Sequence, residues 1–154
     1  MKEEIKTFVK SWKSIRGRTL EFLNKIPEDK WTWKPHPLLG TFGMQVRHMC
    51  KSQEAYINGM KKGTINFSDK KFNSSVETNK KKAMAWMNKL DKDLSLFLRK
   101  ADPNKKIIFL DGVEGKTEVE LKTALDYLMD HEFYHQGIFT CYGRLAGLGK
   151  FLFM

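Results

Sequence analysis

Four long stretches of the 154-residue chain repeat their apolar residues at intervals of three and four. Such intervals follow the 3.6-residue turn of the α-helix, so each stretch predicts a helix with one apolar face. We place these helices at residues 5–26, 41–62, 75–101 and 118–146. Amphipathic helices of this kind bury their apolar faces against one another. The sequence therefore predicts an all-α fold, a four-helix bundle that forms one domain over residues 1–154.

Residues that begin or end helices mark the boundaries of these four segments. Pro27 stops the first helix, and Thr41 is the expected N-cap of the second, which ends before Gly63. Residues 74–77 and 117–120 both follow the capping-box pattern Ser/Thr-x-x-Glu. We therefore expect these two boxes to open the third and fourth helices.

The connecting segments predict less regular structure. The Pro-rich connector 27–40 carries Trp31 and Trp33, which we expect to cover one end of the core. Residues 63–73 are polar and predict a loop. An apolar run ahead of Asp-Gly at 107–113 predicts a short β-hairpin between the third and fourth helices. The apolar tail 151–154 needs a surface to cover it, either the end of the bundle or a second subunit.

The charge of the chain is strongly positive, at +10, and lysines outnumber arginines by 23 to 5. Lysine is the weaker bidentate phosphate ligand, so this composition favours a solvated surface over a nucleic-acid site. No apolar run reaches the roughly 18–20 residues that span a bilayer. The charged N-terminus has no secretory h-region, so we expect a cytoplasmic protein. We expect Cys50 and Cys141 to be buried thiols rather than a disulfide or metal ligands.

Two histidines stand four residues apart, with a glutamate after the first, in the stretch 130–136. On a helix, His131 and His135 share one face and can converge on one metal ion. The spelling His-Glu-x-x-His is also that of a zinc protease, with Glu132 as general base. The third protease ligand would come from downstream, but residues 136–154 contain no histidine, aspartate or glutamate. We therefore look upstream, where His48 is the remaining histidine on a predicted helix; His36 lies in the connector, where an exposed loop histidine is expected.

The chain resembles the DinB/YfiT-like family of metal-dependent four-helix-bundle proteins. The resemblance is carried by residues 26–31 and 34–37 of the connector, by 41–48 at the start of the second helix, and by 127–148 with its two histidines. It implies a divalent metal, such as Zn, Ni or Mn, bound by His48, His131 and His135. It also implies homodimers and, in some members, transferase or isomerase activity that depends on a thiol cofactor.

A metal held by three imidazoles keeps open positions, where it can activate water or a low-molecular-weight thiol. The sequence therefore predicts a metal-dependent enzyme of the thiol-transferase or hydrolase type that acts on a small molecule. Glu132 is the candidate catalytic base; it can instead hydrogen-bond a ligand imidazole, or be an ordinary exposed or capping residue. Two alternatives stay open: a non-catalytic metal-binding or stress-response dimer, and a basic nucleic-acid-binding protein.

Overall fold

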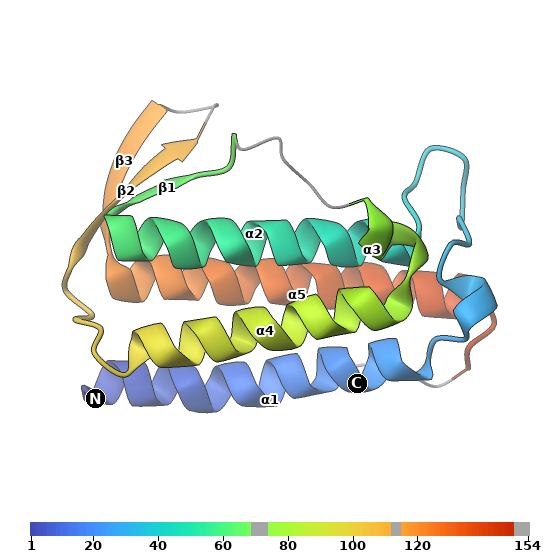
Figure 1. The fold of residues 1–154 in the computed structure, drawn as a ribbon, viewed down its shortest axis with the longest axis horizontal. Coiled ribbons are helices and arrows are strands. Elements are labelled where there is room, and N and C mark those ends of the chain that lie inside the picture. The colour runs from blue at the N-terminus through green and yellow to red at the C-terminus, as the bar shows by residue number, and fades with distance from the viewer. Residues whose placement is uncertain (69–73, 112–114, 150–154) are drawn as a thin grey trace.

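A computed structural model describes residues 1–68, 74–111 and 115–149 of the chain. Within these residues, four long helices lie side by side (Figure 1): α1 (Glu3–Lys25), α2 (Phe42–Lys62), α4 (Lys80–Leu98) and α5 (Leu121–Leu145). Helix α2 packs against α4 and α5, and α1 packs against the same two helices. The predicted four-helix bundle is confirmed.

The shorter elements lie at the two ends of the bundle (Figure 1). The 3-10 helix η1 (Glu28–Lys30) follows α1, and the one-turn helix α3 (Ser75–Thr78) precedes α4. A three-stranded sheet, ordered β1-β2-β3, stands where α2 ends and α5 begins. Its strands are β1 (Thr64–Asn66), β2 (Lys106–Asp111) and β3 (Gly115–Glu120). The predicted hairpin is confirmed as the antiparallel pair β2–β3.

The loop predicted at residues 63–73 is wrong at its start. Strand β1 lies there and pairs in parallel with β2, with Ile65 opposite Phe109. Ile65 is fully buried. Three residues carry no periodicity to recognise, and their hydrogen-bonding partner lies more than forty residues away, so only tertiary pairing makes them a strand.

The structure also corrects both predicted capping boxes. Residues 117–120 belong to β3, where Val119 pairs with Ile107, and α5 begins at Leu121. Residues 75–78 form the separate helix α3, and α4 begins at Lys80, where the Asn79 side chain accepts a hydrogen bond from the backbone N–H of Lys82 at 2.9 Å. In the first case strand pairing with β2 replaces the predicted helix start, and in the second the chain forms a short separate helix before the Asn79 cap.

The predicted boundaries of α2 hold. The hydroxyl of Thr41 accepts a hydrogen bond from the backbone N–H of Met44 at 3.0 Å, which caps α2. Helix α2 ends at Gly63, whose φ of 89° is a left-handed conformation that favours glycine. At the other end of the bundle, where α2 begins, Trp31 is buried, and its indole N–H donates to the carbonyl of Val76 at 3.2 Å.

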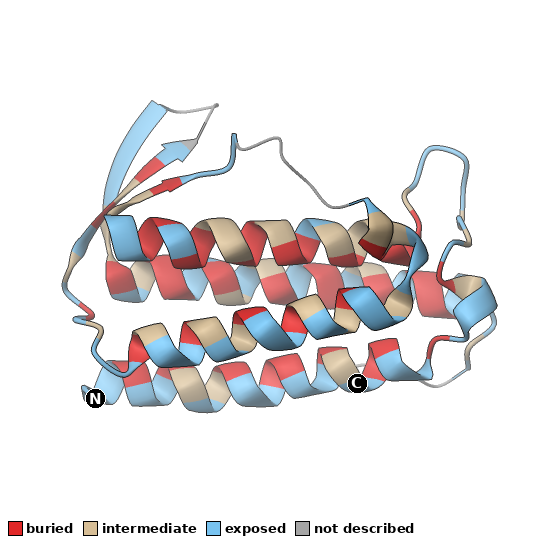
Figure 2. Cartoon of the chain, viewed as in Figure 1, coloured by how far each residue is buried: buried red, intermediate tan, exposed pale blue. Residues whose placement is uncertain are grey.

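The apolar core lies between the four long helices, whose buried faces turn toward one another (Figure 2). Cys50 belongs to this core, as predicted, whereas Cys141 is exposed, which corrects the expectation that both thiols are buried. Both cysteines are free thiols. The apolar tail at 151–154 lies outside the described residues. No helix in the described part of the chain has the length and apolarity needed to cross a membrane.

We predict that Gly59→Ala destabilises the fold by separating β1 from α2. A Cβ atom at this position would lie 2.6 Å from Ile65 Cα and 2.8 Å from the carbonyl oxygen of Thr64. Both are backbone atoms, so they can move away only if the strand itself shifts. We expect a loss of about 1–3 kcal/mol in the free energy of unfolding, typical of overpacking. Urea unfolding measures it.

Gly137→Ala is the matched control, because a Cβ at this position in α5 would meet nothing within 4 Å. Alanine is the better helix former, so this variant should gain about 0.5–1 kcal/mol. Equal stabilities for the two variants would contradict the close approach of β1 to α2.

Candidate metal site

Three histidines from two helices come together in the bundle. His131 and His135 lie one turn apart on α5, and His48 reaches them from α2. The Nε2 atoms of His48 and His131 are 3.1 Å apart. One ring nitrogen from each histidine lies within 4.8 Å of the other two. The sequence placed the two α5 histidines on one face, and the structure brings all three predicted residues into one cluster.

The separation between the ring nitrogens of His48 and His131 fits a single metal ion. Two imidazoles that bind one tetrahedral Zn²⁺ at about 2.0–2.1 Å hold their nitrogens about 3.3 Å apart, close to the separation between His48 and His131. His135 supplies an independent observation. It is 1% exposed, and neither of its ring nitrogens has a hydrogen-bond partner among the described residues. Buried polar atoms without a partner are costly, and a bound cation would satisfy one of these nitrogens.

The surroundings keep all three imidazoles neutral at physiological pH. Burial, then the charge of Arg47, lowers the pKa of His48. Burial, then the neighbouring His48 and the charge of Arg16, lowers the pKa of His131 to about 4. Burial, then the two other histidines, lowers the pKa of His135 to about 3. Neutral imidazoles present the lone pairs that a metal needs.

The cluster opens on one side into a cavity of about 760 Å³. His135 is buried, His131 is half-buried and His48 is exposed, so accessibility rises toward this cavity. His48 and His131 form part of its wall, together with residues of α2 and β1. Tyr56 and Phe67 add an aromatic wall, with ring centroids 5.3 Å apart. A metal bound by the three histidines would therefore have an open position that faces space for a small molecule.

Glu132 lies on the other side of α5, away from the exposed surface. It is 2% exposed, so the reading of an ordinary exposed or capping residue is wrong. Its Oε1 accepts a hydrogen bond of 2.5 Å from the hydroxyl of Thr19, and its Oε2 lies 3.3 Å from Nη1 of Arg16. Burial raises the pKa of this carboxyl, against the opposing charge of Arg16 and the bond from Thr19. Thr19 and Arg16, the two partners of this carboxyl, both belong to α1.

Sequence reasoning missed Arg16, which is 4% exposed at the centre of the bundle. A signal for it exists in the sequence. Arg16 stands four residues after Trp12 and three before Thr19, both buried, so an arginine occupies the inward face of an amphipathic helix. Such residues are almost never fully buried unless they are paired.

The remaining candidates stay outside the cluster. His36 is exposed in the connector, where its Nδ1 accepts a hydrogen bond from the backbone N–H of Leu38 at 3.2 Å. Burial raises the pKa of the Cys50 thiol to about 12, which leaves it protonated and a poor ligand. Among the described residues the candidate metal cluster contains His48, His131 and His135, without either cysteine.

Comparison with known proteins places the site in a family context. The family model described as the DinB family matches residues 1–152. Among solved structures, the chain is similar to the DinB-like protein YjoA from Bacillus subtilis, with 21% sequence identity, a TM-score of 0.63 and coverage of 92% of each chain. At this identity the likeness concerns the fold. A comparison with curated protein sequences found no match.

We predict that acid destabilises the metal-free protein through its histidine cluster. The pKa of His135 is about 3 in the folded chain and about 6.5 in an unfolded one, so between these pH values the unfolded chain binds more protons. The free energy of unfolding therefore rises with pH across this window and falls as the pH drops from about 6.5 toward 3. Urea unfolding with a chelator present, at about pH 4.5–7.5, measures the slope.

His135→Gln should flatten this slope, because glutamine does not titrate. His36→Gln, which replaces the exposed histidine outside the cluster, should leave the slope at the wild-type value. A wild-type slope in His135→Gln would show that the burial of this imidazole does not govern its protonation.

Proposed function

The chain belongs to the DinB family, and on that premise we propose that it is a metal-dependent enzyme whose divalent ion is held by His48, His131 and His135. The observation that carries this proposal is the buried imidazole of His135, which has no hydrogen-bond partner among the described residues and faces two further histidines. An imidazole in this state costs free energy in the empty protein, and coordination would remove part of that cost.

The chemistry follows from the donor set. A divalent ion on three neutral imidazoles supplies Lewis acidity that lowers the pKa of a bound water to about 7 or deprotonates a bound thiol. The three histidines of the chain have different places in the site. His135 anchors the buried side of the site, and His48 and His131 line the side that opens to the cavity. We propose hydrolysis, or transfer of a low-molecular-weight thiol, as the reaction type.

The cavity supports catalysis over metal storage. A storage site needs no space beyond its ligands, whereas here a cavity of about 760 Å³ begins at two of the three histidines. Its wall combines the rings of Tyr56 and Phe67 with polar and charged side chains such as Asn58 and Lys62. This combination suits a small molecule that has both an apolar and a polar part.

We predict that the metal content depends on all three histidines. Protein purified without chelator should contain a divalent metal by elemental analysis, and the stripped protein should rebind Zn²⁺, Ni²⁺ or Mn²⁺. His48→Ala, His131→Ala and His135→Ala should each weaken binding by more than the roughly 10–100-fold that loss of an outer hydrogen-bonding partner costs. His36→Ala should bind as wild type does. The proposal fails if the wild-type protein holds no metal and rebinds none.

We predict that filling the cavity abolishes turnover but spares the metal. Ala55→Trp places an indole in the cavity wall on α2, whereas Ala85→Trp places one on the exposed face of α4. Screens for thiol conjugation and for ester or amide hydrolysis should show an activity that the histidine variants and Ala55→Trp lack. Ala85→Trp should keep it. Full activity in metal-loaded Ala55→Trp would remove the cavity as the substrate site.

A further inference from the structure

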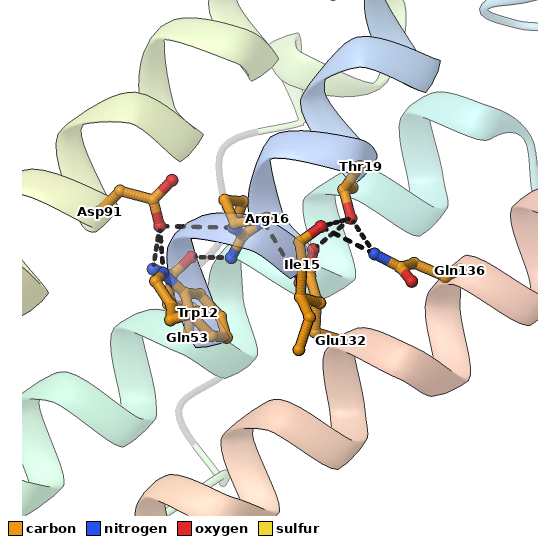
Figure 3. Close-up of polar contacts among 8 residues, drawn as sticks. All are labelled: Trp12, Ile15, Arg16, Thr19, Gln53, Asp91, Glu132 and Gln136. Atoms are coloured by element: carbon orange, nitrogen blue, oxygen red, sulfur yellow. Dashed lines mark hydrogen bonds and ion pairs between the residues drawn. The ribbon is translucent and has the colours of Figure 1, made fainter. Parts of the chain in front are cut away.

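One buried guanidinium connects all four long helices of the bundle (Figure 3). Arg16 of α1 lies 3.3 Å from a carboxylate oxygen of Glu132 on α5 and 3.3 Å from one of Asp91 on α4. Its Nη2 donates a hydrogen bond of 2.6 Å to the amide oxygen of Gln53 on α2. The guanidinium carbon also lies 4.7 Å from the ring centroid of Trp12.

Helix α5 presents two adjacent stripes, each with a four-residue repeat. His131 and His135 form the stripe that meets α2. Glu132 and Gln136, each one position further along, form a stripe about 100° away that meets α1. Each candidate ligand is therefore followed directly by a residue that binds α1.

The second stripe is fully engaged with α1. Thr19 donates its hydroxyl hydrogen to Glu132 and accepts a hydrogen bond of 3.0 Å from the amide of Gln136. That amide also donates to the backbone carbonyl of Ile15 at 2.9 Å. Glu132, Gln136 and Thr19 are all buried. These bonds fix both the rotation of α5 about its axis and its position along the axis, relative to α1.

The same cluster reaches the helix that carries the third histidine. Gln53 stands five residues after His48 on α2, and its amide donates a hydrogen bond of 2.9 Å to Asp91 while its oxygen accepts from Arg16. Both helices that supply candidate ligands are thus bonded to one guanidinium.

Even a small rotation of α5 about its axis would displace the tips of its histidine side chains, because these lie far from the helix axis. With side chains, a helix has a radius of about 5–6 Å, so a rotation of about 10° moves a side-chain tip by about 1 Å. Metal–ligand distances tolerate deviations of about 0.2 Å. Packing of aliphatic side chains alone permits shifts that hydrogen bonds of fixed direction exclude.

We propose that Glu132 and Gln136, held by Arg16 and Thr19 of α1, are positioning residues that orient His131 and His135 toward His48. The inference rests on the proposed metal site. Glu132 acts through the orientation of α5, because its two oxygens are bonded to Thr19 and paired with Arg16. The carboxylate that a zinc protease would use as a base is here an anchor between helices.

The test separates metal affinity from stability. Zn²⁺ dissociation constants are measured by competition with a chromophoric chelator, and unfolding by urea, for Thr19→Val, Arg16→Met, the double variant Arg16→Met/Glu132→Met, and Leu90→Ala. Thr19→Val keeps the shape of the side chain but removes the hydroxyl that bonds Glu132 and Gln136. Leu90→Ala is the stability control, because Leu90 is buried on α4 and belongs to the apolar core.

We expect Thr19→Val to weaken Zn²⁺ binding about 10-fold and Arg16→Met up to about 100-fold. The double variant removes both buried charges, so its stability should return toward that of wild type while its affinity stays weak. Leu90→Ala should lose stability and bind Zn²⁺ as wild type does once folded. If Arg16→Met does not fold, Thr19→Val and the double variant decide the question.

Two results would overturn the inference and leave the metal site intact. One is wild-type Zn²⁺ affinity in both Thr19→Val and the double variant. The other is a double variant whose Zn²⁺ affinity recovers together with its stability. A wild-type protein that binds no Zn²⁺, Ni²⁺ or Mn²⁺ would overturn the metal site as well. The failure of the inference is therefore distinguishable from the failure of the proposed function.

Discussion

The buried charge of Arg16 is the constraint on which the arrangement of the bundle depends. A guanidinium that is 4% exposed requires carboxylates nearby. Asp91 of α4 and Glu132 of α5 supply them. Removing one partner of a buried ion pair typically costs about 3–5 kcal/mol, because an uncompensated charge remains. The apolar faces of the helices bring them together, but only certain rotations satisfy this charge. The polar cluster thus selects one packing among those that burial alone would allow.

Helix α5 divides the interior into a charged side and a neutral side. Glu132 faces the guanidinium as its ion-pair partner, while its neighbour His131 faces α2, where burial keeps the imidazole uncharged. Arg16 acts on both residues: it pairs with Glu132, and its charge also lowers the pKa of His131. Adjacent positions in the sequence therefore hold an ion-pair partner and an uncharged imidazole. A metal site of neutral donors needs this separation, because a protonated imidazole cannot bind a cation.

Much of the fold could be predicted from local pattern. The 3.6-residue repeat revealed the four long helices, and Thr41 and Gly63 marked the ends of α2. Predictions from local pattern were wrong where the backbone of a distant segment pairs with the residues concerned. Residues 117–120 have the sequence of a capping box, yet their backbone pairs with β2. Strand β1 was missed for the same reason, since its three residues become a strand only beside β2.

By itself, the sequence determined which residues can share a face. His131 and His135 are neighbours in any helix because the chain rises one turn between them, and the lack of a downstream ligand follows from reading the last nineteen residues. The tertiary structure decided what each face meets. It brought His48 to the α5 histidines, turned Glu132 toward α1 and opened a cavity beside the cluster. These outcomes depend on contacts between segments up to 121 positions apart, as in the bond from the Gln136 amide to the carbonyl of Ile15. Such contacts arise from the packing of whole helices around one buried charge, which local periodicity does not encode.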